Sequence, residues 1–70
     1  MPKMMKKRDY IRWINQYGWT LERAGGGDWK LHNAHGNIAV RNIIVTHPGN
    51  EIPPISIKKT RLALQTAGLE

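Results

Sequence analysis

The sequence predicts an α+β fold with two layers, in which two helices pack on one face of a three-stranded antiparallel sheet. Apolar residues recur at helical spacing near both ends of the chain, whereas the central segment alternates apolar and polar residues in short runs. Turns that contain glycine separate these runs. In the order α-β-β-β-α, two amphipathic helices bury their apolar sides most simply against one face of a single sheet.

A first helix is expected over residues 7–17, and Gly18 suits the left-handed conformation that ends many helices. Its apolar side consists of Tyr10, Ile11, Trp13, Ile14 and Tyr17. Residues 1–6 are expected to form a frayed basic start, outside a single domain that spans residues 7–70.

Three strands are expected at residues 19–23, 29–32 and 38–46. The pair Arg41-Asn42 interrupts the alternation of the third strand and predicts a β-bulge. The turn between the first two strands consists of Gly25, Gly26 and Gly27. The face of the sheet that points away from the helices is expected to be open, and the alternation places on it Thr20, Glu22, Lys30 and His32.

The second helix is expected to begin after Ser56, which suits the N-cap position, and to end at Gly68. Before it, residues 51–54 are expected to form an extended linker because they include two prolines. After it, Leu69 is expected to fold back onto Leu64 in a Schellman motif.

The composition limits the possible functions. Seventy residues make one small domain that cannot enclose a large cofactor, so we expect function on a surface and no cofactor. The absence of cysteine excludes disulfides, thiol catalysis and thiolate zinc sites. No apolar run reaches the roughly 18 residues of a membrane span, so we expect a cytoplasmic protein without membrane contact. A net charge of +6 favours a polyanionic partner, either nucleic acid or an acidic protein.

Basic residues supply the candidate RNA contacts. Lys30 and His32 share the open face, where a phosphate contact is expected. A second basic cluster at the start of the second helix is either another RNA contact or a solvated helix face, and consists of Lys58, Lys59 and Arg61. The three tryptophans are expected in the core and not as base-stacking platforms. The three histidines are too scattered in the sequence to predict a metal site.

Nearly the whole chain resembles the HicA family of bacterial toxins. The resemblance rests on a basic first helix ending in "NQYGWTLER", a glycine turn into "WKLH", and "HGN" before the third strand. It continues through "THPGNEIPP" and "ISIKKTRLALQTAGLE", and these two blocks are the most specific. The resemblance implies the fold of double-stranded-RNA-binding domains. It also implies a metal-independent endoribonuclease that cleaves mRNA and is neutralised by a HicB-type antitoxin.

In the HicA family the catalytic residue is a histidine just after the glycine turn, and the resemblance places Asp28 at that position. Metal-free RNA cleavage needs one group that removes the proton of the 2′-hydroxyl and another that protonates the leaving 5′-oxygen, and histidine suits both roles. An aspartate carboxylate is a weak base, a poor acid at neutral pH, and repels phosphate. We therefore expect activity to be lower by roughly 10² to 10⁴ than with histidine there.

Several alternatives stay open at this position. His32, His35 or His47 could supply the imidazole from a neighbouring strand or turn, with His32 and His47 as the stronger candidates. A shift of the alignment by one residue would place Trp29 there, which has no suitable chemistry. Asp28 is either a natural replacement or an introduced inactivating change. Beyond the toxin, the alternatives are a non-catalytic RNA- or protein-binding module on the same fold and a small basic interaction protein.

Overall fold

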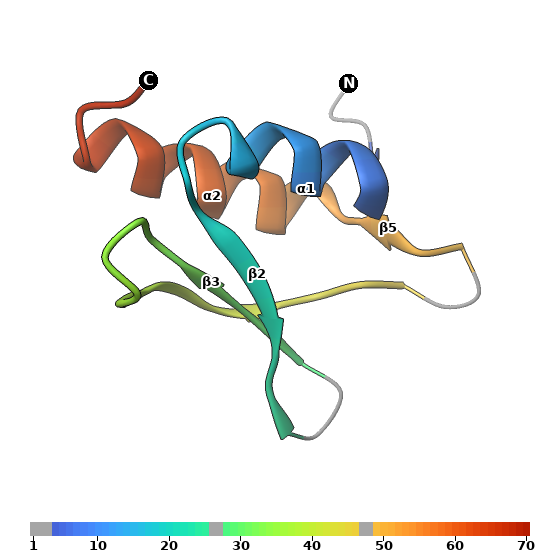
Figure 1. Ribbon diagram of the computed structural model, residues 1–70. Coiled ribbons are helices and arrows are strands. Elements are labelled where there is room, and N and C mark those ends of the chain that lie inside the picture. Colours follow the sequence, from blue (N-terminus) through green and yellow to red (C-terminus); the bar gives the residue numbers. More distant parts are fainter. Residues whose placement is uncertain (1–3, 26–27, 47–48) are drawn as a thin grey trace.

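Two helices lie side by side in one layer, and a three-stranded antiparallel sheet forms a second layer beneath them (Figure 1). The computed structural model describes residues 4–25, 28–46 and 49–70. The predicted α+β class, with both helices on one side of the sheet, is confirmed. The prediction lacked a second, two-stranded sheet at the edge of the molecule.

The first helix, α1 (Lys7–Asn15), ends two residues earlier than expected and stops in a Schellman motif. Gly18 has a φ of 77°, a left-handed conformation that glycine adopts without strain. The N–H of Trp19 donates to the carbonyl oxygen of Ile14 at 3.1 Å, and the N–H of Gly18 donates to that of Asn15 at 3.0 Å. The predicted conformation of Gly18 is confirmed, and it turns the chain directly into the sheet.

The three-stranded sheet has the strand order β2 (Thr20–Arg23), β3 (Trp29–His32) and β4 (Ile38–Ile43). Strand β3 has the predicted bounds, β2 begins one residue later than predicted, and β4 ends three residues earlier. Because β3 is central, its side chains contact both neighbouring strands. It therefore joins the candidate site to the core.

The predicted bulge in the third strand is confirmed. Leu31 pairs with Val40 and Trp29 pairs with Ile43, so β4 has one more residue than β3 between these pairs. Asn42, within this stretch, has a φ of 60°. The bulge bends β4 and ends its regular pairing with β3.

The second sheet pairs β1 (Met5–Lys6) with β5 (Glu51–Ile52) in antiparallel fashion. The N–H of Lys7 extends this pairing by donating to the carbonyl oxygen of Asn50 at 2.9 Å. The prediction of a frayed start is therefore wrong for Met5 and Lys6. Glu51 and Ile52 are extended, as predicted for this linker, and also pair with another strand. Ladder hydrogen bonds order both segments and hold the starts of the two helices together.

The second helix, α2 (Pro54–Thr66), begins before Ser56, so the prediction of Ser56 as the N-cap is wrong. Pro54 stands at the start of the helix, where its missing N–H costs no hydrogen bond and its fixed φ suits the helix. Ser56 is buried, and its Oγ accepts the N–H of Ile44 at 3.3 Å. Among the described residues, no helix is long and apolar enough to cross a membrane.

The predicted Schellman motif at the end of α2 is confirmed. The N–H of Leu69 donates to the carbonyl oxygen of Leu64 at 2.8 Å, and Gly68 has a φ of 78°. The N–H of Gly68 donates to the carbonyl oxygen of Gln65 at 3.0 Å. Both helices therefore end in the same way, with a left-handed glycine.

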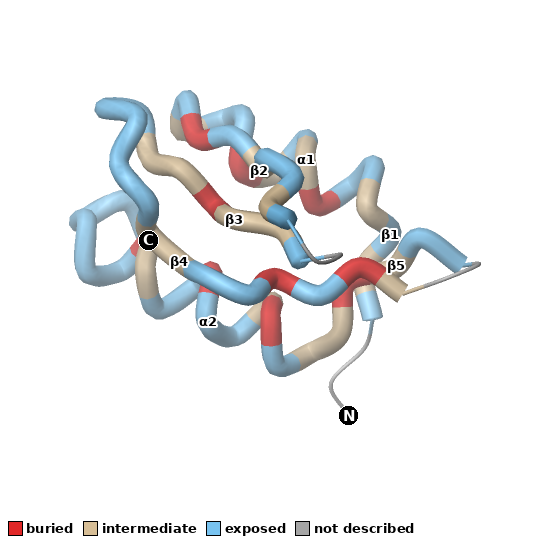
Figure 2. The backbone as a smooth tube through the Cα atoms, turned by 90° about the horizontal axis from the view of Figure 1, so that it is seen from below, coloured by how far each residue is buried: buried red, intermediate tan, exposed pale blue. Residues whose placement is uncertain are grey.

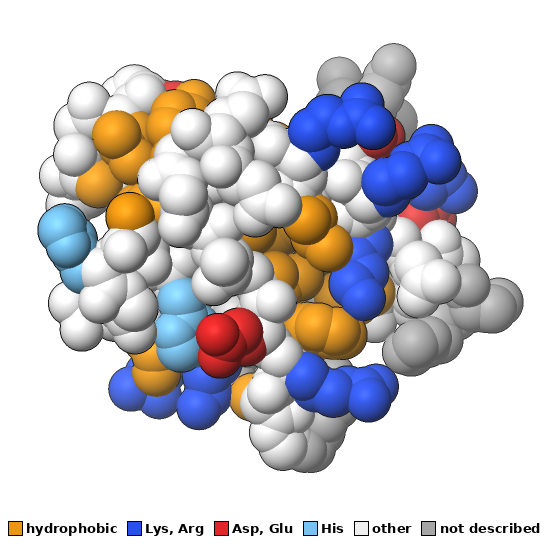
Figure 3. Space-filling model, in the orientation of Figure 1, with side chains coloured by type: hydrophobic (Ala, Val, Ile, Leu, Met, Phe, Trp, Pro, Cys, Tyr) orange, Lys and Arg blue, Asp and Glu red, His pale blue; other side chains and the backbone are white. Residues whose placement is uncertain are grey.

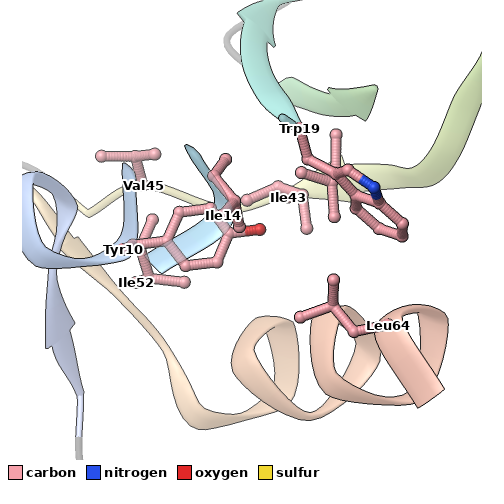
Figure 4. Packing of buried hydrophobic residues seen from close by; sticks show 8 residues of the cluster. Tyr10, Ile14, Trp19, Ile43, Val45, Ile52 and Leu64 are labelled. Atoms are coloured by element: carbon pink, nitrogen blue, oxygen red, sulfur yellow. The ribbon is translucent and has the colours of Figure 1, made fainter. Parts of the chain in front are cut away.

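The core lies between the two layers, and its side chains point toward one another from the helices and the sheet (Figure 4). Trp19 is 3% exposed and belongs to the core, as predicted. Trp13 and Trp29 are only partly buried and pack against the core from its edges. The buried apolar side chains are Tyr10, Ile14, Trp19, Leu31, Ile43, Val45, Ile52 and Leu64.

A short polar chain crosses the core. Thr60 Oγ1 donates its one proton to the carbonyl oxygen of Ser56 at 2.9 Å, so the hydroxyl of Tyr10 donates to Thr60 Oγ1 at 2.6 Å. Burial raises the pKa of Tyr10 to about 12. These bonds fix α1 against α2 at one register.

Candidate nucleic-acid interface

Figure 2 looks at the sheet from the side away from the helices, and the strand pairing places the predicted polar residues on this face. Glu22 pairs directly with Lys30, and Thr20 pairs with His32, so all four side chains share one face. Thr20 and Glu22 are exposed, whereas Lys30 and His32 are half-buried. The alternation in the sequence predicted this grouping because the strands are regular here.

His32 is held between two oxygen atoms and is 18% exposed. Its Nδ1 lies 3.2 Å from the carbonyl oxygen of Gly36, and its Nε2 lies 3.6 Å from Oε2 of Glu22. Only the protonated imidazolium could donate from both nitrogens. The two oxygen atoms hold the ring in one orientation on the open face of the sheet.

The turn after His32 is closed by the side chain of Asn33. Its Oδ1 accepts the N–H of His35 at 2.9 Å and the N–H of Asn37 at 3.1 Å. His35 is exposed in this turn and contacts none of the other candidate residues through a hydrogen bond that the structure describes. The turn places the Gly36 carbonyl against His32 and so fixes the orientation of its ring.

Asp28 stands at the end of the β2–β3 hairpin and is exposed. The N–H of Ala24 donates to the carbonyl oxygen of Asp28 at 2.8 Å, so the pairing of the strands continues to these residues. Of the predicted glycine turn, Gly25 is described, whereas Gly26 and Gly27 lie outside the described residues.

The structure does not place the side chain of His32 close to that of Asp28. The two residues are four apart along an extended segment, which corresponds to roughly 13 Å at the rise of a β-strand. General acid–base groups that act on one bond must lie within hydrogen-bond reach of it, directly or through one water. His32 therefore cannot replace an imidazole at position 28 for a bond held at Asp28. His47, the other predicted helper, lies outside the described residues.

The basic residues of α2 do not form one surface. Lys58 lines a groove with Met4 and Leu62, whereas Lys59 lines another groove beside β4. The Nε of Arg61 lies 3.8 Å from Oε1 of Glu70. Since α2 lies in the helical layer, these three residues are not grouped with Lys30 and His32 on the open face of the sheet (Figure 1).

The prediction missed two cations at the hairpin. The Nζ of Lys7 lies 4.1 Å from the centre of the Trp29 ring, and the Cζ of Arg23 lies 5.6 Å from it. Arg23 pairs directly with Trp29 across the strands, so the predicted strand pairing could have shown this contact. The contact of Lys7 depends on how α1 packs, which has no signal in the sequence.

Among the described residues, no group of three or more His, Cys, Asp or Glu side chains is placed to hold a metal ion. Comparison of the chain with protein-family models, with curated proteins and with solved structures found no match.

Proposed function

We propose that the chain is a HicA-like toxin of a toxin–antitoxin system that acts on mRNA in the cytoplasm and is catalytically impaired by Asp28. The observation that carries the proposal is the placement of Asp28. It is exposed at the mouth of the glycine hairpin, two residues before Lys30 on the same extended segment. A histidine at this place would face solvent, where an RNA strand can reach it.

The order of the sequence blocks supports the family, and the charge supports RNA as the partner. A net charge of +6 on 70 residues attracts phosphates and favours binding at low salt. On the open face, Lys30 and the His32 ring can contact the RNA backbone. A partner that neutralises this toxin must itself be acidic, as a HicB-type antitoxin would be.

Expression of variants at position 28 in bacteria tests this proposal. Asp28→His should arrest growth and degrade mRNA because it supplies the imidazole, and Asp28→Asn is the matched control that only removes the charge. Growth and mRNA integrity are followed after induction. Growth arrest and mRNA loss caused equally by the unchanged chain would contradict the role of Asp28.

A non-catalytic binding module is the second candidate, and an apolar groove along α2 favours it. Ile55 and Leu62 are 58% and 53% exposed there and line the same groove, so their apolar surface is contiguous. The charged residues that line the groove are Lys58 and Arg61, both basic. This combination fits an acidic amphipathic segment of a protein partner, such as the antitoxin.

The two candidates differ in a measurable way. If Asp28→His causes no arrest while the purified protein still binds RNA, the binding module is favoured. For the groove, Leu62→Glu should weaken copurification with an acidic HicB-type antitoxin, while Thr66→Glu, on the same helix but outside the groove, serves as a control. Equal copurification of both variants and the unchanged chain would reject the groove as the docking site.

A further inference from the structure

Two cations meet at one tryptophan beside the hairpin. Lys7 is the first residue of α1, Arg23 is the last residue of β2, and Trp29 is the first residue of β3. Both cationic groups lie over the Trp29 ring, at the 4.1 and 5.6 Å given above. The face of an aromatic ring attracts cations, which explains how three separate elements hold this cluster together.

The cluster has an excess of positive charge. Both distances are measured to one ring centre, so the two cations are within about 10 Å of each other, close to the Debye length of about 8 Å at physiological salt. Neither forms an ion pair with a carboxylate in the part of the chain that the structure describes, where the Lys and Arg side chains that do so are Lys6, Arg8 and Arg61.

The position of the cluster connects it to residue 28. Trp29 follows Asp28 directly, and Arg23 precedes Ala24, whose N–H bonds Asp28. Lys and Arg side chains follow one side of the molecule from the start of α1 down toward this hairpin (Figure 3). Because side chains alternate along a strand, Asp28 and the Trp29 cluster lie on opposite faces at the same end of the hairpin, and an RNA strand that passes around this end would meet both.

We propose that Lys7 and Arg23, held over Trp29, bind backbone phosphates of a single-stranded RNA next to residue 28. The inference rests on the proposed function, since it names the contacts that bring RNA to the same site. Trp29 is a positioning residue, because it orients the two cations and does not itself read the RNA. Phosphate contacts of this kind place a strand without selecting its sequence.

Binding of a fluorescent single-stranded oligouridylate to the purified chain, measured between 50 and 200 mM salt, tests the inference. Each phosphate contact contributes about 0.7 to the slope of log K against log salt for single strands. The double variant Lys7→Gln and Arg23→Gln should therefore reduce the magnitude of this negative slope by about 1.4. The matched control, Lys58→Gln and Lys59→Gln, removes the same charge from α2 and should leave most of the slope in place.

Variants of Trp29 test its positioning role. Trp29→Leu keeps an apolar side chain but loses the aromatic face, so it should weaken RNA binding toward that of the double variant. Trp29→Phe keeps an aromatic face and should bind RNA more tightly than Trp29→Leu. Both variants lose packing volume, so the difference between them reports on the aromatic face. Equal RNA affinity of the two folded variants would contradict the role of the ring, and circular dichroism checks that both are folded.

The outcomes separate the inference from the proposed function. If both double variants lower the slope equally, the cations act only through net charge and the inference is wrong while RNA binding stands. If the unchanged chain binds no RNA even at 50 mM salt, the proposed function fails, and the phosphate site with it.

Discussion

Asp28 and His32 illustrate how position and environment separate the roles of two residues on one strand segment. Asp28 is exposed at the hairpin mouth and makes a backbone hydrogen bond to Ala24, so its side chain is available to solvent. His32 is held between Glu22 and the Gly36 carbonyl. In the proposed toxin, the first position decides cleavage, whereas the second can only assist in holding RNA.

Tyr10 links the helices through a single buried hydroxyl. Burial raises the pKa of this hydroxyl and outweighs the opposing effect of the bond to Thr60. A neutral tyrosine is therefore favoured by the folded state. Because the folded pKa of about 12 exceeds the unfolded value of 10.0, this contribution to stability is complete below pH 10 and is lost as the pH rises toward 12.

We expect the free energy of unfolding of the unchanged chain to fall between pH 9 and 12, with Tyr10 contributing up to about 3 kcal/mol to the fall. Tyr10→Phe should cost about 1 kcal/mol at pH 7 through the lost hydrogen bond, and should show a smaller fall at high pH. Urea unfolding at pH 7 and at pH 12 measures the free energy of unfolding of the unchanged chain and of Tyr10→Phe. A fall at high pH of the same size in Tyr10→Phe and in the unchanged chain would contradict the assignment to Tyr10.

At the scale of the elements, the helix ends were predictable because they depend on local backbone conformation. Gly18 and Gly68 each follow a helix and have positive φ, as their sequence positions indicated. The start of α2 was not predictable in the same way, because Pro54 suits both an extended linker and the first turn of a helix. The pairing of β1 with β5 was missed because two-residue strands have no periodicity.

Gly68→Ala should lower the free energy of unfolding by about 1–2 kcal/mol, because an alanine side chain is strained at a φ of 78°. Gly25→Ala is the matched control. A Cβ at either glycine would meet no atom within 4 Å, and the two sites differ in that Gly25 lacks the positive φ. Thermal unfolding measures both variants. Equal destabilisation would show that backbone strain at Gly68 is not the cause.

A carboxylate at the end of the chain joins α2 to α1. Oε2 of Glu70 accepts the indole N–H of Trp13 at 2.6 Å and the hydroxyl of Tyr17 at 3.0 Å, and the bond to Glu70 raises the pKa of Tyr17. Arg61 lies beside the same carboxylate and 5.7 Å from the centre of the Trp13 ring. These contacts hold the Arg61 side chain next to the end of α1, and its predicted RNA contact stays a prediction.

At the scale of the whole molecule, the sequence predicted the layers and the open face of the sheet but not the distribution of its charge. Alternation alone placed Lys30 and His32 together, since they are on one strand. Lys7 reaches Trp29 through the packing of α1, which joins residues far apart in sequence. The basic residues of α2 diverge because successive positions on a helix point about 100° apart.

The whole molecule therefore presents two surfaces that, under the proposals above, suit different partners. The hairpin end combines the exposed residue 28 with the cations on Trp29, and suits a phosphate backbone. The groove along α2 combines exposed apolar side chains with a basic rim, and suits an acidic protein segment. In the proposed toxin, RNA and antitoxin contact different elements, and their binding competes only where the antitoxin also reaches the hairpin.

The central claim is that this scaffold cleaves RNA when position 28 carries an imidazole. The most direct test is the cleavage rate of a single-stranded RNA by the purified unchanged chain, by Asp28→His and by Asp28→Asn, with a chelator present. Asp28→His should cleave roughly 10² to 10⁴ faster than the other two, which is the usual contribution of a positioned acid–base group. Equal rates for the histidine and asparagine variants would contradict the claim.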